Sequence, residues 1–287
     1  MTTANANAIF LISCPDRKGL VARISDFVFR HNGNILHADE HLDDEAGLFL
    51  MRLEWDLAGF DLSRDRIPGA FEPLARELEL NWQLRFSDEV SRGAIFVSKY
   101  DHCLYDLLYR YRSGELRAEF PLVVSNHPDL RGLVEGFGPE YLVFPITKET
   151  KAAQEERILE ELARQKIDFI VLARYMQIVT ENFVRHHPNR IINIHHSFLP
   201  AFAGPQPYHQ AHRRGVKLIG ATSHYVTPDL DSGPIIAQDV VRISHRDSID
   251  DLIRKGRDLE KVVLARAVRA HLEHRVLVHG NKTAVFD

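Results

Sequence analysis

The chain is poor in cysteine and has no strongly basic or strongly apolar stretch. It contains 2 cysteines among 287 residues, too few for a disulfide framework, which favours a reducing compartment. The formal net charge is −4 and no lysine-rich tract occurs, so neither a nucleic-acid partner nor an anionic membrane surface is expected. The N-terminus is short and polar, without the pattern of a signal peptide or a membrane span. These features predict a cytoplasmic protein.

The 16 histidines do not form a recognisable metal motif. No HExxH occurs, and the histidine pairs lack a carboxylate or cysteine at a standard ligand spacing. His195 and His196 are adjacent on a predicted strand, so their side chains would project to opposite faces and would not share one ion. We therefore expect a site without a metal.

The hydrophobic pattern changes at 88–93, which predicts a linker between two domains. Residues 1–87 follow the order β-α-β-β-α-β of a ferredoxin-like domain, with strands at 8–14, 35–42, 48–55 and 81–86 and helices at 19–31 and 67–78. Residues 94–287 alternate helices with short apolar runs at 94–98, 122–125, 141–144, 169–172 and 191–194, and end in a long helix predicted over 248–277. Such alternation is typical of an α/β fold with a doubly wound, mostly parallel sheet.

Three polar residues in the second domain suggest acyl chemistry. Asn193 and His195 end a β-branched run, and since they are two positions apart they project from one face of the strand. In a parallel sheet they would lie at the carboxyl edge, where such folds bind ligands. Asp231 opens the turn Asp-Ser-Gly-Pro. Singly, each is more often a turn former or a satisfied polar group; together they supply the amide, imidazole and carboxylate that carry an acyl carbon through a tetrahedral intermediate.

The motifs around these residues resemble a known family. They are Asn193-Ile-His195, Ser197-Phe-Leu-Pro200, the run GATSHYV at 220–226 and the run DSGPII at 231–236. This set resembles the folate-dependent formyltransferases, which include glycinamide ribonucleotide formyltransferases, methionyl-tRNA formyltransferases and formyltetrahydrofolate deformylases. The form HHSFLPAF, preceded by an extra N-terminal module, is most similar to the deformylases. The resemblance covers nearly the whole chain and implies a Rossmann-like formyltransferase domain.

The turn that follows the first strand of the second domain decides between these relatives. In the nucleotide-using formyltransferases a Gly/Ser-rich loop holds a phosphate on its backbone amides. This chain has Ser-Lys-Tyr-Asp-His-Cys at 98–103, without glycine. With no bound amine acceptor, water is the nucleophile that remains. We therefore expect hydrolysis of 10-formyltetrahydrofolate to formate and tetrahydrofolate. The formate would supply purine biosynthesis, and the reaction would balance one-carbon pools. The alternatives are formyl transfer to an amine, of the glycinamide ribonucleotide type, and a folate or amino-acid sensor without catalysis.

For the expected hydrolysis, Asn193 and the His195 ring would hydrogen-bond the developing oxyanion, one such donor being worth about 3 kcal/mol. Asp231 would orient the water, take its proton and relay protons toward the departing N10 atom. Folate would be the substrate, and no cofactor is expected. The resemblance implies that Met176, Gln177, Ile178 and Val179 bind the substrate, and that the loop 227–231, with Asp229, forms another wall of its pocket. His224, on the strand predicted over 220–226, is expected to contact the substrate or to hold water or Asp231.

The loop between the first strand and the first helix resembles the entry loop of ACT domains, which commonly bind amino acids. Its residues Asp16, Arg17, Lys18 and Gly19 are the candidate effector site, with glycine or methionine as the expected effector. Asp16 could instead only cap the helix. Ferredoxin-like modules also pair edge to edge, which predicts a homo-oligomer; regulation and assembly both stay open, as does the role of the proline-rich segment 203–207.

Overall fold

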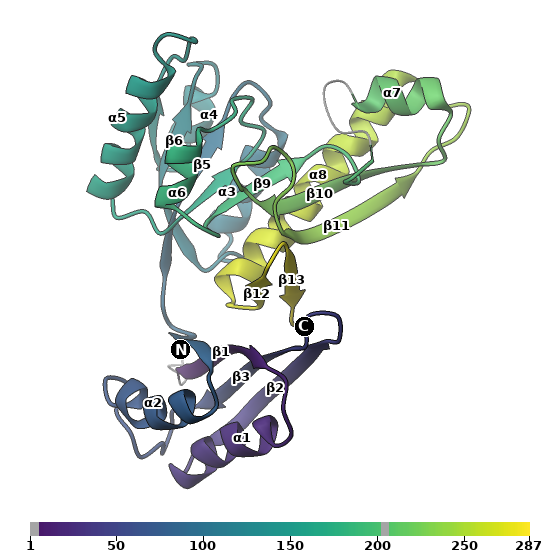
Figure 1. The fold of residues 1–287 in the computed structure, drawn as a ribbon. Coiled ribbons are helices and arrows are strands. Elements are labelled where there is room, and N and C mark those ends of the chain that lie inside the picture. Colours follow the sequence, from purple (N-terminus) through teal and green to yellow (C-terminus); the bar gives the residue numbers. More distant parts are fainter. Residues whose placement is uncertain (1–5, 202–206) are drawn as a thin grey trace. The chain divides into compact units, whose positions relative to one another are not determined.

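A computed structural model describes residues 6–201 and 207–287 (Figure 1). The chain forms two compact units. The N-terminal unit contains the chain up to Glu89 together with Glu273–Leu277 and Ala284–Asp287, and the second unit contains Val90–Leu272 and Val278–Thr283. The last residues are thus shared between the units, whereas the sequence pattern had placed all of 94–287 in one domain.

The N-terminal unit has the ferredoxin-like order that the sequence predicted. Its elements are β1 (Asn7–Pro15), α1 (Leu20–Arg30), β2 (Asn34–Asp43), β3 (Leu48–Asp56), α2 (Ile67–Glu77) and β4 (Asn81–Phe86). The antiparallel sheet has the order β2-β3-β1-β4. Its helix-covered face packs aromatic side chains, with the rings of Phe10 and Phe71 stacked at 4.2 Å and Trp55 fully buried beside them. Alternation along β1 accounts for this, because every second side chain enters the same core.

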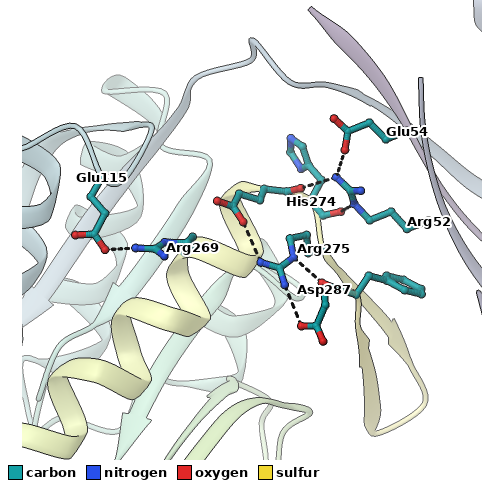
Figure 2. A network of polar contacts seen from close by, with 9 residues as sticks. Arg52, Glu54, Glu115, Arg269, His274, Arg275 and Asp287 are labelled. Carbon is teal, nitrogen blue, oxygen red and sulfur yellow. Dashed lines mark hydrogen bonds and ion pairs between the residues drawn. The ribbon is translucent and has the colours of Figure 1, made fainter. Parts of the chain in front are cut away.

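The other face of this sheet is covered by the end of the chain. Leu11 and Leu50 form a small core with three tail residues, which are Leu277, Ala284 and Phe286. Figure 2 shows the polar contacts around this core: the buried Arg52 pairs with Glu54 at 2.8 Å and donates to the His274 carbonyl, while Arg275 pairs with Asp287. The segments Glu273–Leu277 and Ala284–Asp287 are therefore an integral part of the N-terminal unit.

The prediction of a helix to residue 277 was wrong at its end. Helix α8 covers Ile249–Leu272, and His274 has a φ of 51°, a left-handed conformation that breaks the helical path. The chain continues as a two-stranded sheet, β12 (Val276–His279) with β13 (Lys282–Val285). Valines at 276 and 278 favour the strand over the helix.

The second unit is an α/β fold with the mostly parallel sheet that the sequence predicted. Its elements are β5 (Ser91–Val97), α3 (His102–Arg112), β6 (Ala118–Ser125), α4 (Arg131–Glu135), β7 (Glu140–Val143), α5 (Lys151–Arg164), β8 (Phe169–Leu172), α6 (Glu181–His186), β9 (Ile191–His195), α7 (Pro207–Arg214), β10 (Leu218–Tyr225), β11 (Ile235–Arg242) and α8. The strand order is β11-β10-β9-β8-β5-β6-β7. Strand β5 begins at Ser91, so part of the predicted linker 88–93 belongs to the sheet.

The sheet of the second unit is parallel from β9 to β7. Strand β10 runs antiparallel to β9, and the edge strand β11 runs antiparallel to β10. Helices α5 and α6 pack on one face, while α3 and α8 lie on the other. Among the described residues, no helix is long and apolar enough to cross a membrane. The carboxyl ends of β5, β8 and β9 meet at one edge of the sheet, and this edge carries the candidate site.

Candidate active site

Asn193 and His195 line one cavity at the carboxyl end of β9, as their spacing predicted. Asp231 lies on the loop between β10 and β11 and lines the same cavity. Because β10 pairs antiparallel with β9, its residue His224 lies directly opposite Asn193. The structure therefore brings the three predicted catalytic residues and His224 together from two neighbouring strands and one loop.

The hydrogen bonds of His224 determine how Asn193 is oriented. His224 Nδ1 donates to the Tyr225 carbonyl at 2.9 Å, which leaves Nε2 as an acceptor for the Asn193 amide Nδ2 at 3.2 Å. Burial lowers the pKa of His224, so the ring stays neutral and keeps this acceptor at neutral pH. One amide hydrogen of Asn193 is thus fixed on His224, and the second is available to a substrate oxygen.

Asp231 is held as a carboxylate against His195. The two side chains lie 3.2 Å apart, Nδ1 to Oδ1, and His224 Nε2 is 3.9 Å from the same oxygen. The hydrogen bond from His195 lowers the pKa of Asp231 and outweighs the opposing effect of partial burial. At neutral pH the group is ionised and can accept a proton.

The turn that carries Asp231 needs its glycine. Asp231 itself has a φ of 53°, and a Cβ at position 233 would lie 1.8 Å from the Tyr225 carbonyl oxygen. The backbone is closed there by a hydrogen bond from the Tyr225 amide to the Pro234 carbonyl at 2.9 Å. The close approach that only glycine permits thus places the carboxylate against the end of β9.

One ring nitrogen of His195 is free to meet a ligand. Nδ1 faces Asp231, while Nε2 is buried and has no hydrogen-bond partner among the described residues. A buried polar atom without a partner costs about 1–3 kcal/mol. Such an atom in a cavity is a natural contact for a substrate heteroatom.

The predicted folate-binding residues line the same cavity, which has a volume of about 670 Å³. All six of them are among its lining residues, namely Met176, Gln177, Ile178, Val179, His224 and Asp229. Met176 and Ile178 are 54% and 60% exposed, and Leu230 on the facing loop is also 60% exposed. Large apolar side chains left open around a cavity form a slot that suits a flat ring system.

The cavity is also lined by a buried polar cluster that sequence reasoning missed. Its members, here called the Glu260 cluster, are His102, Arg174, Tyr208 and Glu260. The carboxylate of Glu260 accepts hydrogen bonds from His102 at 2.8 Å and from Tyr208 at 2.5 Å. The signal that could have revealed it is an acid on the apolar face of a helix, since Glu260 follows Leu259 among the packed residues of α8.

His102, Cys103 and Glu260 are close enough together to be considered as metal ligands. Their chemistry does not fit this role, because both oxygens of Glu260 are occupied by hydrogen bonds and the Arg174 guanidinium lies 3.5 Å away. Burial also raises the pKa of the Cys103 thiol well above its ordinary value, so it keeps its proton. We assign this group to hydrogen bonding.

The predicted effector residues lie in the N-terminal unit, between β1 and α1. Asp16 does not cap α1, because Gly19 is the N-cap residue, with a φ of 90°, and no side chain in the described part of the chain bonds to the first helical amides. Asp16 is exposed, and Arg17 pairs with Glu79 at 3.1 Å. In the proline-rich segment 203–207, residues up to 206 lie outside the described part of the chain, and 207 begins α7.

Comparisons with known proteins agree with this geometry. Residues 91–268 match the formyl transferase family model. The chain is 59% identical over 282 residues to the formyltetrahydrofolate deformylase of Synechocystis sp., which covers 98% of this chain and 99% of that protein. The crystal structure of a formyltetrahydrofolate deformylase from Pseudomonas syringae superposes with a TM-score of 0.96 at 48% identity, covering 100% of this chain and 96% of that one.

The formyltransferases are more distant. Glycinamide ribonucleotide transformylase 1 from Symbiobacterium toebii has a TM-score of 0.64 at 30% identity and covers 71% of this chain and 98% of its own. The deformylases, by contrast, match along the full length, including the ferredoxin-like unit. The chain belongs to the formyltetrahydrofolate deformylase family.

Proposed function

We propose that this enzyme hydrolyses 10-formyltetrahydrofolate to formate and tetrahydrofolate. The observation that carries the proposal is the arrangement of Asn193, His195 and Asp231 on one cavity with an apolar rim. The full-length match to deformylases supports water as the acceptor. Formyl transfer to an amine, the alternative reaction, is not favoured, because the nucleotide-using relatives match less of the chain.

The substrate binds with its rings in the apolar slot. A volume of about 670 Å³ lies within the ordinary range for small-molecule pockets. The pterin and benzoyl rings lie between Met176 and Ile178 on one side and Leu230 on the other, and cover side chains that are otherwise exposed to water. The formyl group then reaches the polar end of the cavity at Asn193.

Attack by water is assisted at both ends of the forming bond. The free amide hydrogen of Asn193 and the Nε2 atom of a protonated His195 hydrogen-bond the formyl oxygen as it becomes negative. Asp231 orients the water and takes one of its protons as the new C–O bond forms. No cofactor takes part in the proposed mechanism.

Collapse of the intermediate needs a proton at N10. Once Asp231 is neutral, it no longer stabilises the positive charge on His195, which lies 3.2 Å away, so the ring gives its Nε2 proton to N10 and the C–N10 bond breaks. Tetrahydrofolate leaves with that proton, and formic acid loses its own to solvent as formate. The proton held by Asp231 returns to His195 and restores the site.

The test is the release of formate and tetrahydrofolate from 10-formyltetrahydrofolate by purified protein, in a chelator and without an amine. We expect equal amounts of both products, and a loss of at least about two orders of magnitude in kcat for Asp231→Asn with substrate affinity retained. Asp250→Asn, an exposed acid at the start of α8, is the matched control. Product formation that requires an added amine or a metal would refute the proposal.

For the N-terminal unit we propose an ACT-type role, in which glycine or methionine binds at the loop formed by Asp16, Arg17, Lys18 and Gly19. Two features support it: among the described residues no side chain caps the first amides of α1, and Asp16 is exposed in the loop before this helix. A carboxylate would meet the amides and an ammonium would meet Asp16. The sheet also leaves β2 as an edge strand, with Leu36 and Leu42 exposed, which supports a homo-oligomer.

The effector proposal is tested by the rate of formate release from the full-length enzyme with and without each amino acid. A change in rate that disappears in Asp16→Asn supports it. If the rate is unchanged and calorimetry detects no binding, the effector proposal is wrong and the unit serves assembly instead. The molar mass of the protein in solution tests that role. We place the enzyme in the cytoplasm, where its formate would supply purine biosynthesis.

A further inference from the structure

The Glu260 cluster lines the same cavity as the apolar slot. Its four residues come from separate elements, with His102 at the start of α3, Arg174 after β8, Tyr208 on α7 and Glu260 on α8. All four line the cavity that contains Asn193 and Asp231. With the folate rings in the slot, a second substrate would share the cavity with this cluster.

Glu260 is a buried carboxylate, and each of its two oxygens already accepts a hydrogen bond from a protein donor. Its side chain is 1% exposed, one oxygen accepts from His102 and the other accepts from Tyr208. Burial acts to raise the pKa of Glu260, but the hydrogen bond from His102 and the charge of Arg174 hold the pKa below its usual value. A carboxylate beside an acyl-transfer site is the group that would bind an amine, and here protein donors occupy it.

Arg174 supplies the cation that accompanies this carboxylate. Its side chain is 10% exposed, and its Nε atom lies 3.5 Å from Glu260 without forming a hydrogen bond. The backbone at Arg174 has a φ of 64°, a costly conformation for a residue with a side chain. Tyr100 stacks against this guanidinium at 5.3 Å and against that of Arg257 at 5.5 Å. Two positive charges thus border the cavity at Tyr100.

We propose that the Glu260 cluster reserves the site for water, with Arg174 in the place that the ammonium group of an amine acceptor would take beside Glu260. The inference rests on the proposed hydrolysis and specifies its acceptor. In the excluded reaction an amine nitrogen would bond to the formyl carbon, the C–N10 bond would break, and the proton lost by the amine would pass to N10. The products would be a formamide and tetrahydrofolate.

Charge and space explain why water is accepted and an amine is excluded. Aliphatic amines are mainly protonated at neutral pH, and two like charges about 4 Å apart repel by about 4 kcal/mol near a protein surface. An ammonium ion would therefore meet Arg174 and Arg257 instead of a free carboxylate. Water is small and neutral, so it passes the cluster without this cost. The glycine-free turn at 98–103 contributes Tyr100 and His102 to the same barrier.

Arg174→Gly is the variant that tests the inference, because glycine adopts the positive φ without strain and removes the guanidinium. Glycinamide in excess is the probe, and the measured quantity is the ratio of N-formylglycinamide to formate from 10-formyltetrahydrofolate. We expect almost no formamide from the wild-type enzyme and a rise of at least about tenfold in this ratio for the variant, equivalent to 1.4 kcal/mol. Arg174→Lys keeps the charge and should keep the wild-type ratio.

Tyr208→Phe tests the same inference without altering Arg174. It frees one oxygen of Glu260 for an amine and keeps the ring, so the ratio should also rise. Tyr105→Phe, an exposed tyrosine of α3, is the matched control and should not change it. If Arg174→Gly does not fold, Tyr208→Phe alone decides.

The inference is overturned if folded variants release formate and make no more formamide than the wild type. It is equally overturned if wild-type enzyme formylates glycinamide as well as the variants do. Failure of the proposed function has a different signature, the absence of formate in the wild-type reaction without amine. The two outcomes are read from separate reactions.

Discussion

Replacing Asn193 by alanine should reduce the rate of hydrolysis without weakening substrate binding. The Asn193 amide donates one hydrogen to His224 Nε2 at 3.2 Å, and its second hydrogen is the proposed oxyanion donor. One such donor contributes about 3 kcal/mol to the transition state, which corresponds to roughly 150-fold in kcat. The contact strengthens only as the oxygen becomes negative, so KM should change little.

The same substitution should also affect stability, through a different contact. Without the amide, His224 Nε2 is buried with no donor, which should lower the free energy of unfolding by about 1–3 kcal/mol. Asn193→Asp keeps the shape but offers no hydrogen and adds a negative charge near Asp231, so its kcat should fall at least as far. Asn182→Ala, an exposed position on α6, is the control for both assays.

Steady-state kinetics of formate release and urea unfolding measure these two effects. A loss in kcat below about tenfold for both Asn193 variants would refute the oxyanion role, since it is far below the worth of a single donor. A loss that lies wholly in KM would also refute it, because it would place the contact in substrate binding.

Three further outcomes follow from the structure. Gly233→Ala should displace the turn that carries Asp231, because the added Cβ would lie 1.8 Å from the Tyr225 carbonyl oxygen; we expect kcat to fall by about two orders of magnitude with a loss of stability, and unchanged kinetics would contradict this. The pKa of Asp231 is lower in the folded enzyme than its ordinary 3.8, so its ionised form adds stability that is complete above that value and is lost as the pH falls through the folded pKa. The difference in unfolding free energy between wild type and Asp231→Asn should accordingly shrink below about pH 4, and a difference that grows there would show the opposite sign of shift. Phe286→Ala should lower the free energy of unfolding of the N-terminal unit by about 3 kcal/mol in urea, because Phe286 is buried in its core. Val285→Ala, at a more exposed position, should change this free energy little, and equal effects of the two substitutions would show that Phe286 is not part of the core.

The expected absence of a metal and of a cofactor stays a prediction, and the first assay in chelator tests it. Both ring nitrogens of His224 already form hydrogen bonds, to Asn193 and to the Tyr225 carbonyl. Burial lowers the pKa of His196 to about 4. Neutral His196 lies beside His195, with ring centres 5.0 Å apart, and adds no charge to the site.

The local sequence pattern was enough to predict most helices and strands and part of the candidate site. Alternation along the run at 191–195 is a property of any strand, so it correctly placed Asn193 and His195 on one side. The β-α-β-β-α-β order of the N-terminal unit and the parallel sheet of the second unit also followed from periodicity. The end of α8 was missed, because the apolar residues near 277 pack in the N-terminal unit and not on the helix face that their spacing suggested.

The tertiary structure decided which distant residues meet. Periodicity within a segment determines which side a residue faces, but it contains no information on which strand lies next to it. The antiparallel pairing of β10 with β9 sets His224 opposite Asn193, and the packing of α7 and α8 brings Tyr208 to Glu260 across 52 positions. These contacts depend on how buried faces far apart in the sequence fit together, so they exist only in the folded chain.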